Sequence, residues 1–278
     1  MVDSKLDAEL LQLARSAAEA AADVLLTDRP DVLTTDTKSS AVDVVTQMDR
    51  RSENLIRDAV LRVRPLDSFL GEEGGASTGS SGVTWLVDPL DGTVNYLYDF
   101  PIWAVSIAAE VDGLTRVGVV VVPRLGQTFW ATRDAGAFCN DRGAIRQLRV
   151  SNPVTLSQSL VATGFGYRRG RRAMQSRALV GVLPNVRDIR RAGAAAVDLC
   201  FVASGRVDAY FERGLSPWDV AAGALIATEA GAIVVPPDNS FASDALYFAA
   251  APSIAVELAD LLQRVGAYDL DLPDDVDV

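Results

Sequence analysis

Two aspartates follow an apolar run in the segment WLVDPLDGT (85–93): Asp88 ends the run, and Asp91 comes three residues later. Aspartate, proline and glycine are frequent turn formers, so an ordinary surface turn is one interpretation. The alternative is a metal and phosphate site, because this spacing lets both carboxylates and the Leu90 carbonyl converge on one side. Divalent cations bind several such oxygens held by a compact frame. The spacing therefore favours phosphoryl-transfer chemistry over a simple turn.

The next two residues, Gly92 and Thr93, suit the phosphate half of such a site. Free N–H groups at the start of a helical turn can bind a phosphate, and glycine permits a close approach to the backbone. The Thr93 hydroxyl can orient a water molecule. Together with the two aspartates, these residues supply groups that could hydrolyse a phosphate ester.

Other acids stand at the ends of predicted elements. Glu72 and Glu73 follow a strand, Asp219 begins a long apolar helix, and Asp43 and Asp49 precede the second helix. Taken singly, the two glutamates are typical of a solvated loop, and Asp219 is typical of a first-turn acid favoured by the helix dipole. Taken together with Asp88 and Asp91, these acids predict one carboxylate-rich site.

The chain has no histidine. Serine–histidine hydrolysis, histidine-nucleophile phosphatases and histidine-ligated zinc sites are therefore excluded. Hydrolytic chemistry has to use carboxylates, hydroxyl groups and bound cations, and a carboxylate-rich site favours hard ions such as Mg²⁺.

Length and composition indicate a globular protein. The 278 residues can bury a large core, and 49% hydrophobic with 23% charged residues is an ordinary balance. A net charge of −11 argues against general nucleic-acid binding, although five of the negative charges lie in the acidic segment after residue 267. No apolar run is long enough to span a membrane, the first residues do not resemble a signal peptide, and two cysteines make no disulfide framework. We expect a soluble cytoplasmic protein with no membrane partner.

Hydrophobic periodicity and turn residues predict the elements that position these acids. Residues 4–28 are typical of a long helix with an apolar stripe, and residues 49–63 of a second helix closed by Pro65. The stripe is Leu6, Leu10, Leu13, Ala17, Ala20 and Val24. Residues 34–49 are expected to form a loop or an irregular hairpin, and the Gly/Ser-rich segment 71–82 a flexible loop.

Strands are predicted at 67–70, 84–88, 103–111, 116–123, 127–132, 159–163, 186–190, 207–211, 232–235 and 246–250, and later helices at 171–182, 194–204, 217–230 and 252–265. This order is typical of an α+β half followed by an α/β half, with sheets layered between helices. We expect an N-terminal half that carries the metal motif (1–150), a C-terminal half (151–266) and an acidic, disordered tail (267–278).

Several segments resemble the signature sequences of the inositol monophosphatase family, which are lithium-sensitive, Mg²⁺-dependent phosphatases. These segments are KSSAVDVVTQMD (38–49), GEEG (71–74), WLVDPLDGTVNY (85–96), FPIWAVSIA (100–108), RRAGAAAVDLCFVASGRVDAYFERG (190–214) and PWDVAAGALIATEAGA (217–232). The likeness spans roughly residues 10–260 and is greatest to SuhB-like bacterial members. It implies a layered αβαβα sandwich of the inositol monophosphatase and fructose-1,6-bisphosphatase type, and a homodimer.

The resemblance also implies roles for the acids. Two to three Mg²⁺ ions would be held by Glu72, Asp88, the Leu90 carbonyl, Asp91 and Asp219, with Asp88 shared between two of them. Glu72 and Thr93, supported by Asp49, would activate a water for in-line attack on phosphorus. The segment around Lys38 would be a mobile metal loop.

Substrate contacts follow from the same resemblance. They would be Asp91, Gly92, Thr93, Gly193, Ala195, Glu212 and Asp219. Glu212 would hydrogen-bond ring hydroxyls, and Gly193 and Ala195 would shape a sugar-alcohol pocket in the C-terminal half. The implied reaction is hydrolysis of myo-inositol 1-phosphate and related polyol phosphates. Ala194 and Ser216 stand where animal enzymes carry a threonine and a histidine, so the exact polyol is left open.

Other functions are compatible with parts of this pattern. Histidinol-phosphate, fructose-1,6-bisphosphate and 3′-phosphoadenosine-5′-phosphate phosphatases share the D-P-L/I-D-G-T core. The arginines at 168, 169, 171, 172 and 177 could be a solvated helix face, a guide for an anionic substrate, or a surface for RNA or a protein partner. SuhB-like proteins have a transcription-linked role, so a binding function is a second hypothesis. The full set of acids favours the enzyme.

Two further motifs are interpreted as structural. Cys200 and Arg206 have the C-x₅-R spacing of cysteine-dependent phosphatases, but the surrounding AAAVDLCFVASGR segment predicts an apolar helix that buries the thiol. The glycines of TGFGYRRG (163–170) are one residue off the dinucleotide-binding pattern. We expect neither a cysteine mechanism nor a nucleotide-binding fold.

Overall fold

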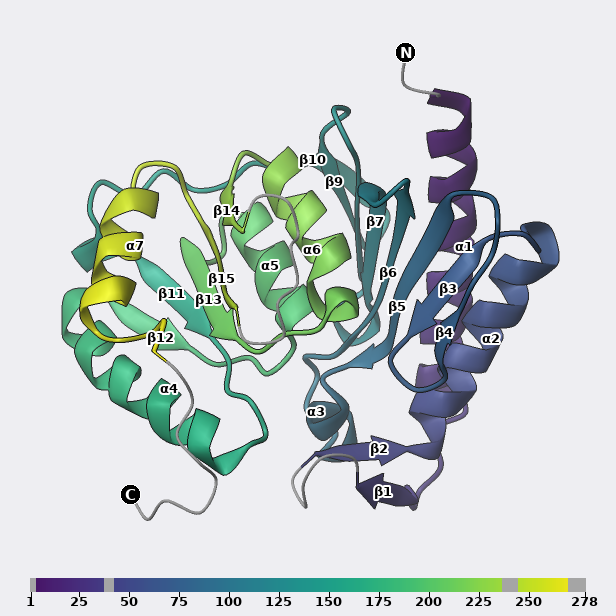
Figure 1. Cartoon of the computed structure of the whole chain (residues 1–278), viewed down its shortest axis with the longest axis horizontal. Helices are drawn as coiled ribbons and strands as arrows, with labels where there is room; N and C mark the ends of the chain where they lie inside the picture. The colour runs from purple at the N-terminus through teal and green to yellow at the C-terminus, as the bar shows by residue number, and fades with distance from the viewer. Residues whose placement is uncertain (1–3, 38–42, 237–244, 270–278) are drawn as a thin grey trace.

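Two β-sheets alternate with layers of helices in the computed structural model, which describes residues 4–37, 43–236 and 245–269 (Figure 1). The helices are α1 (Ser4–Thr27), α2 (Gln47–Val63), α3 (Thr93–Leu97), α4 (Arg169–Val182), α5 (Ala195–Ala203), α6 (Pro217–Glu229) and α7 (Ala255–Arg264). A short antiparallel pair, β1 (Thr35–Thr37) and β2 (Val44–Thr46), precedes α2.

The larger sheet has eight strands in the order β10-β9-β8-β7-β6-β5-β3-β4. They are β3 (Ser68–Gly71), β4 (Gly75–Ser77), β5 (Val83–Asp91), β6 (Ala104–Val111), β7 (Leu114–Val122), β8 (Gln127–Thr132), β9 (Ala137–Asp141) and β10 (Ala144–Gln147). Neighbouring strands are antiparallel except for β3 and β5, which run parallel.

The smaller sheet has five strands in the order β12-β11-β13-β15-β14. They are β11 (Leu160–Thr163), β12 (Asp188–Arg190), β13 (Ala209–Arg213), β14 (Ile233–Val235) and β15 (Leu246–Ala250). β11 runs parallel to both β12 and β13, and the remaining pairs are antiparallel.

Alternating side chains on the central strands bury both faces of each sheet. Trp85 of β5 points to the α1 and α2 side, and Leu86 points to the α5 and α6 side. On β13, Tyr210 faces α5 and α6, and Phe211 faces α4 and α7. The helices α5 and α6 are apolar on nearly all sides, as expected for helices between two sheets. The predicted αβαβα sandwich is confirmed.

The buried face of α1 differs from the predicted stripe. Ala20 is exposed, while Ala14, Ala18 and Ala21 are buried. Small residues occur on most sides of this helix, so the sequence does not select one face. The buried ion pair between Asp7 and Arg116 on β7, with Oδ2 and Nη2 2.6 Å apart, fixes which side meets the sheet.

Short elements account for the other differences. The 34–49 segment contains the expected irregular hairpin, but α2 begins at Gln47, two residues before the predicted start. The segment 71–82 was expected to be a loop throughout, which is wrong for β4, because β4 pairs with β3. The strands β9 and β10 and the helix α3 were not predicted.

The two sheets divide along the chain between residues 147 and 160, close to the expected boundary at 150. However, α5 and α6 share one hydrophobic core with the larger sheet, so the division into halves stays a prediction. Ala267, at the expected start of the tail, is buried, and the predicted loop around Lys38 and residues 270–278 lie outside the described residues. No described helix is long and apolar enough to cross a membrane. The cytoplasmic location stays a prediction.

Candidate active site

A cavity of about 330 Å³ lies where β3, β5 and β13 end near the start of α5 and α6. Its volume is within the usual range for small-molecule sites. Nearly every predicted site residue lines it: Glu72, Asp88, Leu90, Asp91, Gly92, Thr93, Gly193, Ala195, Glu212 and Asp219. Asp43 also lines it. Asp49 does not, but its carboxylate contacts Thr93. The fold therefore brings together residues that are up to 176 positions apart in the chain.

The β5 strand presents the two central aspartates through an irregularity. Its pairing with β6 is regular as far as Asp88 and shifts register before Asp91. Pro89 has no N–H to donate, and such a bulge re-aims neighbouring side chains. Asp88 Oδ1 accepts the Leu90 N–H at 3.0 Å, which holds the bend. Asp88 is 3% exposed and Asp91 7%, so the surface-turn interpretation is wrong.

Asp91 joins β5 to the start of α5. Its Oδ1 accepts the Ala195 N–H at 3.1 Å, and its Oδ2 accepts the Ala196 N–H at 2.8 Å. The first N–H groups of a helix have no partner inside the helix, so a carboxylate there is stabilised by hydrogen bonds and by the helix dipole. This contact connects an acid of the larger sheet with the wall that carries Gly193 and Ala195.

Asp49 and Asp219 occupy the same position in their helices, the third residue of α2 and of α6. Asp49 Oδ2 accepts the Thr46 N–H at 2.9 Å, and Asp219 Oδ2 accepts the Ser216 N–H at 2.7 Å. Both acids thus cap a helix, as the spacing T-x-x-D and S-x-x-D indicates. For Asp219 the first-turn and cavity interpretations both hold, because it also lines the cavity.

Burial raises the pKa of the cavity acids. For Asp88 and Asp219 the pKa lies well above its usual value, first because both are buried and then because Glu72 is nearby. Burial raises the pKa of Asp91 to about 7 against the opposing hydrogen bonds from α5. Burial also raises the pKa of Glu212 to about 7, opposed by the Tyr210 hydroxyl, which donates to Glu212 Oε2 at 2.7 Å. Buried carboxylates that repel one another need protons or cations.

The donor chemistry fits a hard divalent cation. Glu72, Asp88, Asp91 and Asp219 offer only oxygen atoms, and a carboxylate oxygen that accepts one N–H retains a lone pair for an ion. Within the described ranges, no three such side chains already converge on one point as a finished ligand set.

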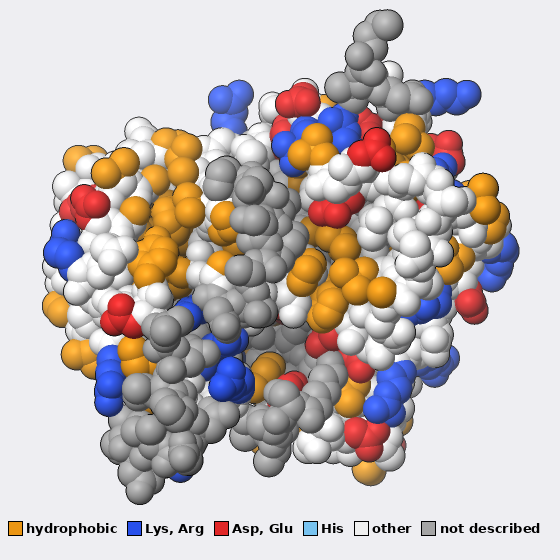
Figure 2. Space-filling view, in the orientation of Figure 1, with side chains coloured by type: hydrophobic (Ala, Val, Ile, Leu, Met, Phe, Trp, Pro, Cys, Tyr) orange, Lys and Arg blue, Asp and Glu red, His pale blue; other side chains and the backbone are white. Residues whose placement is uncertain are grey.

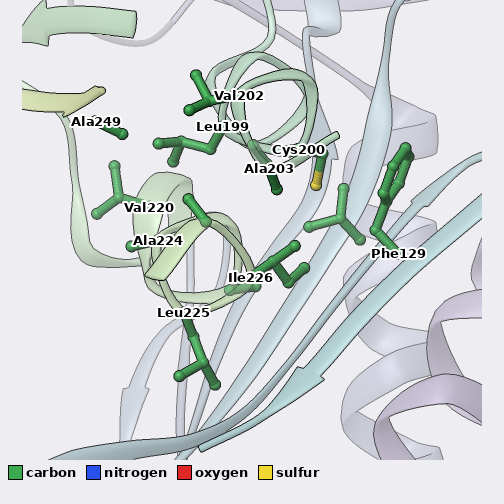
Figure 3. Packing of buried hydrophobic residues seen from close by; sticks show 14 of the residues in the cluster. Phe129, Leu199, Cys200, Val202, Ala203, Val220, Ala224, Leu225, Ile226 and Ala249 are labelled. Atoms are coloured by element: carbon green, nitrogen blue, oxygen red, sulfur yellow. The ribbon is translucent and has the colours of Figure 1, made fainter. Parts of the chain in front are cut away.

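The cysteine alternative is excluded by packing. Cys200 of α5 is fully buried, and burial raises the pKa of its thiol well above the usual value. Figure 3 shows it among apolar side chains that include Phe129 and Ile226. The Arg206 guanidinium instead donates to Gln127 at 2.8 Å. The C-x₅-R spacing therefore forms no phosphate site, as expected from the sequence.

Some cavity residues were missed or left open by the sequence analysis. Of the arginines at 168–177, Arg168 and Arg171 line the cavity. Arg191 also lines it, although no local pattern in the sequence assigns it to a site. The neutral residues Phe165, Tyr167 and Trp218 also line it. A further acid, Asp198 of α5, is 2% exposed, and its Oδ1 has no hydrogen-bond partner within the described part of the chain. A lone aspartate inside the apolar segment AAVDLCF could have indicated it.

A layered α/β fold with buried carboxylates around one cavity suits the hydrolysis of a phosphate ester with bound cations. The model of the inositol monophosphatase family matches residues 6–267, so the chain belongs to this family. It is an enzyme, a phosphatase of this superfamily.

Individual relatives agree with this assignment. The "Inositol-1-monophosphatase SuhB" of Mycobacterium tuberculosis is 45% identical over 238 residues, which cover 84% of this chain and 82% of the relative. The "Nus factor SuhB" of Pasteurella multocida is 40% identical, with 91% and 96% covered. Among solved structures, the extragenic suppressor protein suhB of Bartonella henselae has a TM-score of 0.85 at 36% identity, with 92% and 99% covered.

Proposed function

We propose that the protein is a Mg²⁺-dependent phosphomonoesterase that hydrolyses myo-inositol 1-phosphate and related polyol phosphates. The observation that carries this proposal is the shared cavity, in which Glu72, Asp88, Asp91 and Asp219 accompany Glu212. Four acids offer oxygens for cations, and the fifth is available to a hydroxylated substrate. Relatives at 45% identity that are named inositol-1-monophosphatase support the substrate class.

In this proposal, two to three Mg²⁺ ions are held by Glu72, Asp88, the Leu90 carbonyl, Asp91 and Asp219. When bound, Mg²⁺ neutralises charge on the phosphate and increases the acidity of the attacking water. Thr93, oriented by Asp49, and Glu72 position that water, and the Glu72 carboxylate accepts its proton. The Gly92 and Thr93 backbone lies at the start of α3, where N–H groups can hold phosphate oxygens.

The leaving polyol is held on the opposite wall. Glu212 accepts hydrogen bonds from ring hydroxyls, and the Gly193 and Ala195 backbone leaves room for the ring. Inhibition by Li⁺, a homodimeric state and the absence of a covalent phosphoenzyme are parts of the same proposal, and each rests on the family resemblance.

A phosphate-release panel with Mg²⁺ tests the substrate assignment. Its members are inositol 1-phosphate, histidinol phosphate, fructose 1,6-bisphosphate and 3′-phosphoadenosine 5′-phosphate. We expect turnover of the inositol substrate with a higher kcat/KM than histidinol phosphate or the nucleotide. Turnover confined to either of those two compounds rejects the polyol assignment.

A regulatory role is the second candidate, because relatives at 40% identity are named Nus factor SuhB. Such a role requires an RNA or protein partner, but it does not require an intact cavity. Co-purification of transcription proteins with both the wild-type chain and an Asp219→Asn variant would support it, since the association would then be independent of catalysis.

A further inference from the structure

Three arginines line the same cavity as the acids and have no part in the proposed metal or polyol contacts. They are Arg168, just before α4, Arg171, in its first turn, and Arg191, between β12 and α5. In Figure 2, basic side chains lie beside the hollow between the two halves, on the side of the C-terminal half, and acidic side chains lie across from them. The cavity therefore has both a carboxylate wall and a cationic wall.

Arg171 is built into this wall. Its side chain is 9% exposed, although arginine is among the residues least often buried. It lies along two glycines: a β-carbon at Gly166 would lie 2.7 Å from Arg171 Cδ, and one at Gly214 would collide with its guanidinium. The two glycines therefore leave room for the Arg171 guanidinium at the edge of the cavity.

Arg191 lies over the part of the cavity assigned to the polyol. A β-carbon at Gly193 would collide with Arg191 Nη1, so the guanidinium covers that glycine. Arg191 and then Arg171 are the positive charges that lower the pKa of Glu212. The charges that act most on Asp88, Asp91 and Asp219 are instead other acids of the cavity. Together with the contacts at Gly193 and Gly214, this places both arginines near Glu212.

We propose that Arg171 and Arg191 form a subsite for a second anionic group on the substrate, a phosphate or a carboxylate at the end of the polyol remote from the scissile phosphate. The planar guanidinium group binds such anions with paired, charge-assisted hydrogen bonds. A neutral polyol has no group of this charge to offer. The inference rests on the proposed polyol phosphatase function and extends it to one substrate class, polyol phosphates with an anionic far end.

Three six-carbon substrates separate the chemistry. Glucitol 6-phosphate has a neutral far end, 6-phosphogluconate a carboxylate, and glucitol 1,6-bisphosphate a second phosphate. With Mg²⁺ present, we expect kcat/KM for the two anionic-ended substrates to exceed that for glucitol 6-phosphate by about tenfold or more, the usual effect of one charged hydrogen-bonded contact. Comparing kcat/KM for 6-phosphogluconate with that for glucitol 1,6-bisphosphate identifies whether the subsite favours a carboxylate or a phosphate.

Variants of Arg191 test whether the preference for anionic-ended substrates depends on its guanidinium group. Arg191→Gln should lower kcat/KM for the anionic-ended substrates about tenfold more than for glucitol 6-phosphate, and Arg191→Lys should lower it less. Arg187→Gln is the matched control, because it removes the same charge from an exposed position near β12 that does not line the cavity. Equal kcat/KM for all three substrates in the wild type, or equal effects of Arg191→Gln and Arg187→Gln, would overturn the inference.

Calorimetric binding keeps this inference separate from the proposed function. If no substrate is hydrolysed, the phosphatase proposal fails, and the subsite is still tested by the affinity of the same three compounds. A gain of about tenfold for the anionic-ended compounds that is lost in Arg191→Gln upholds the subsite. Equal affinities of the wild type and Arg191→Gln for the anionic-ended compounds reject the subsite.

Discussion

Thr93 Oγ1 lies 2.8 Å from Asp49 Oδ1, a contact that joins the start of α3 to the first turn of α2. Asp49 is fully buried, and its other oxygen accepts the N–H and hydroxyl of Thr46 at 2.9 and 2.6 Å. The carboxylate is therefore held from two sides and accepts a hydrogen bond from the Thr93 hydroxyl. The Leu90 carbonyl, 3.1 Å from Thr93 Oγ1, is a second acceptor. The lone pairs of Thr93 are then left to accept a hydrogen bond from a water in the cavity.

This geometry predicts the effect of removing the hydroxyl. Thr93→Val keeps the shape but cannot orient the water, so kcat should fall by about 10² or more with a smaller change in KM. Thr93→Ser keeps the hydroxyl and should retain most of the wild-type rate. Steady-state kinetics of the two variants, with folding checked by circular dichroism, measures this. A Thr93→Val enzyme with wild-type kcat would contradict the role of the hydroxyl.

Phosphatase activity should require Mg²⁺ and should need more of it at low pH. Because the pKa of Asp91 is raised to about 7 and those of Asp88 and Asp219 are also raised well above their usual value, protons compete with the cation as pH falls. The Mg²⁺ concentration for half-maximal rate should therefore rise by about tenfold or more between pH 8 and pH 6. EDTA should abolish activity and Mg²⁺ restore it. Undiminished turnover in chelator rules out the metal mechanism.

Asp219→Asn tests the metal acids with little change in shape. The amide oxygen can still accept the Ser216 N–H, but one formal charge is lost from the cavity. We expect kcat/KM to fall by about 10² or more. Cys200→Ser is the contrasting variant, because Cys200 is buried in the core of α5 and α6. It should cost about 1–3 kcal/mol of stability through the buried hydroxyl and leave kcat/KM nearly unchanged. The opposite result in these two variants would place the site elsewhere.

Glu212→Gln separates polyol recognition from chemistry. The charged hydrogen bonds that Glu212 offers to ring hydroxyls are absent with an aryl phosphate, so kcat/KM should fall about tenfold or more for inositol 1-phosphate and far less for 4-nitrophenyl phosphate. Since the pKa of Glu212 is about 7, the carboxylate is charged above that pH. The ratio of kcat/KM for the two substrates should therefore rise from pH 6 to pH 8 in the wild type and stay flat in the variant. Equal losses on both substrates would show that Glu212 serves a structural contact with its neighbouring arginines.

Asp198 predicts a pH-dependent loss of stability. Burial raises its pKa well above the usual value, Glu212 and Asp91 add to this, and Arg191 opposes it. The folded protein keeps a proton that the unfolded chain loses above about pH 4, so the free energy of unfolding falls by about 1.4 kcal/mol per pH unit up to the folded pKa. Asp198→Asn is neutral at every pH and avoids this loss. Urea denaturation in EDTA should show a stability advantage of the variant that grows from pH 5 to pH 8, and an advantage independent of pH would refute the assignment.

The metal acids could be predicted from the sequence because each lies in a short segment with its own chemical pattern. Asp88 and Asp91 flank a proline after an apolar strand, and Asp219 opens an apolar helix after Ser216 and a proline. The absence of histidine restricts the remaining chemistry to oxygen ligands. Long helices and buried strands were equally predictable, because amphipathic or apolar runs of that length have few alternative structures. These features depend on residues close together in the chain.

The tertiary structure decided what depends on segments far apart. The strands β4 and β10 are short and mostly exposed, so only their pairing partners make them strands. The alanine-rich helix α1 has several possible buried faces, and the contact with Arg116 on β7 selects one. Arg171 and Arg191 are 20 residues apart and line the same cavity because β12 and the start of α5 return the chain to it. Convergence of this kind arises from packing between distant segments, and no local pattern of residue types contains it.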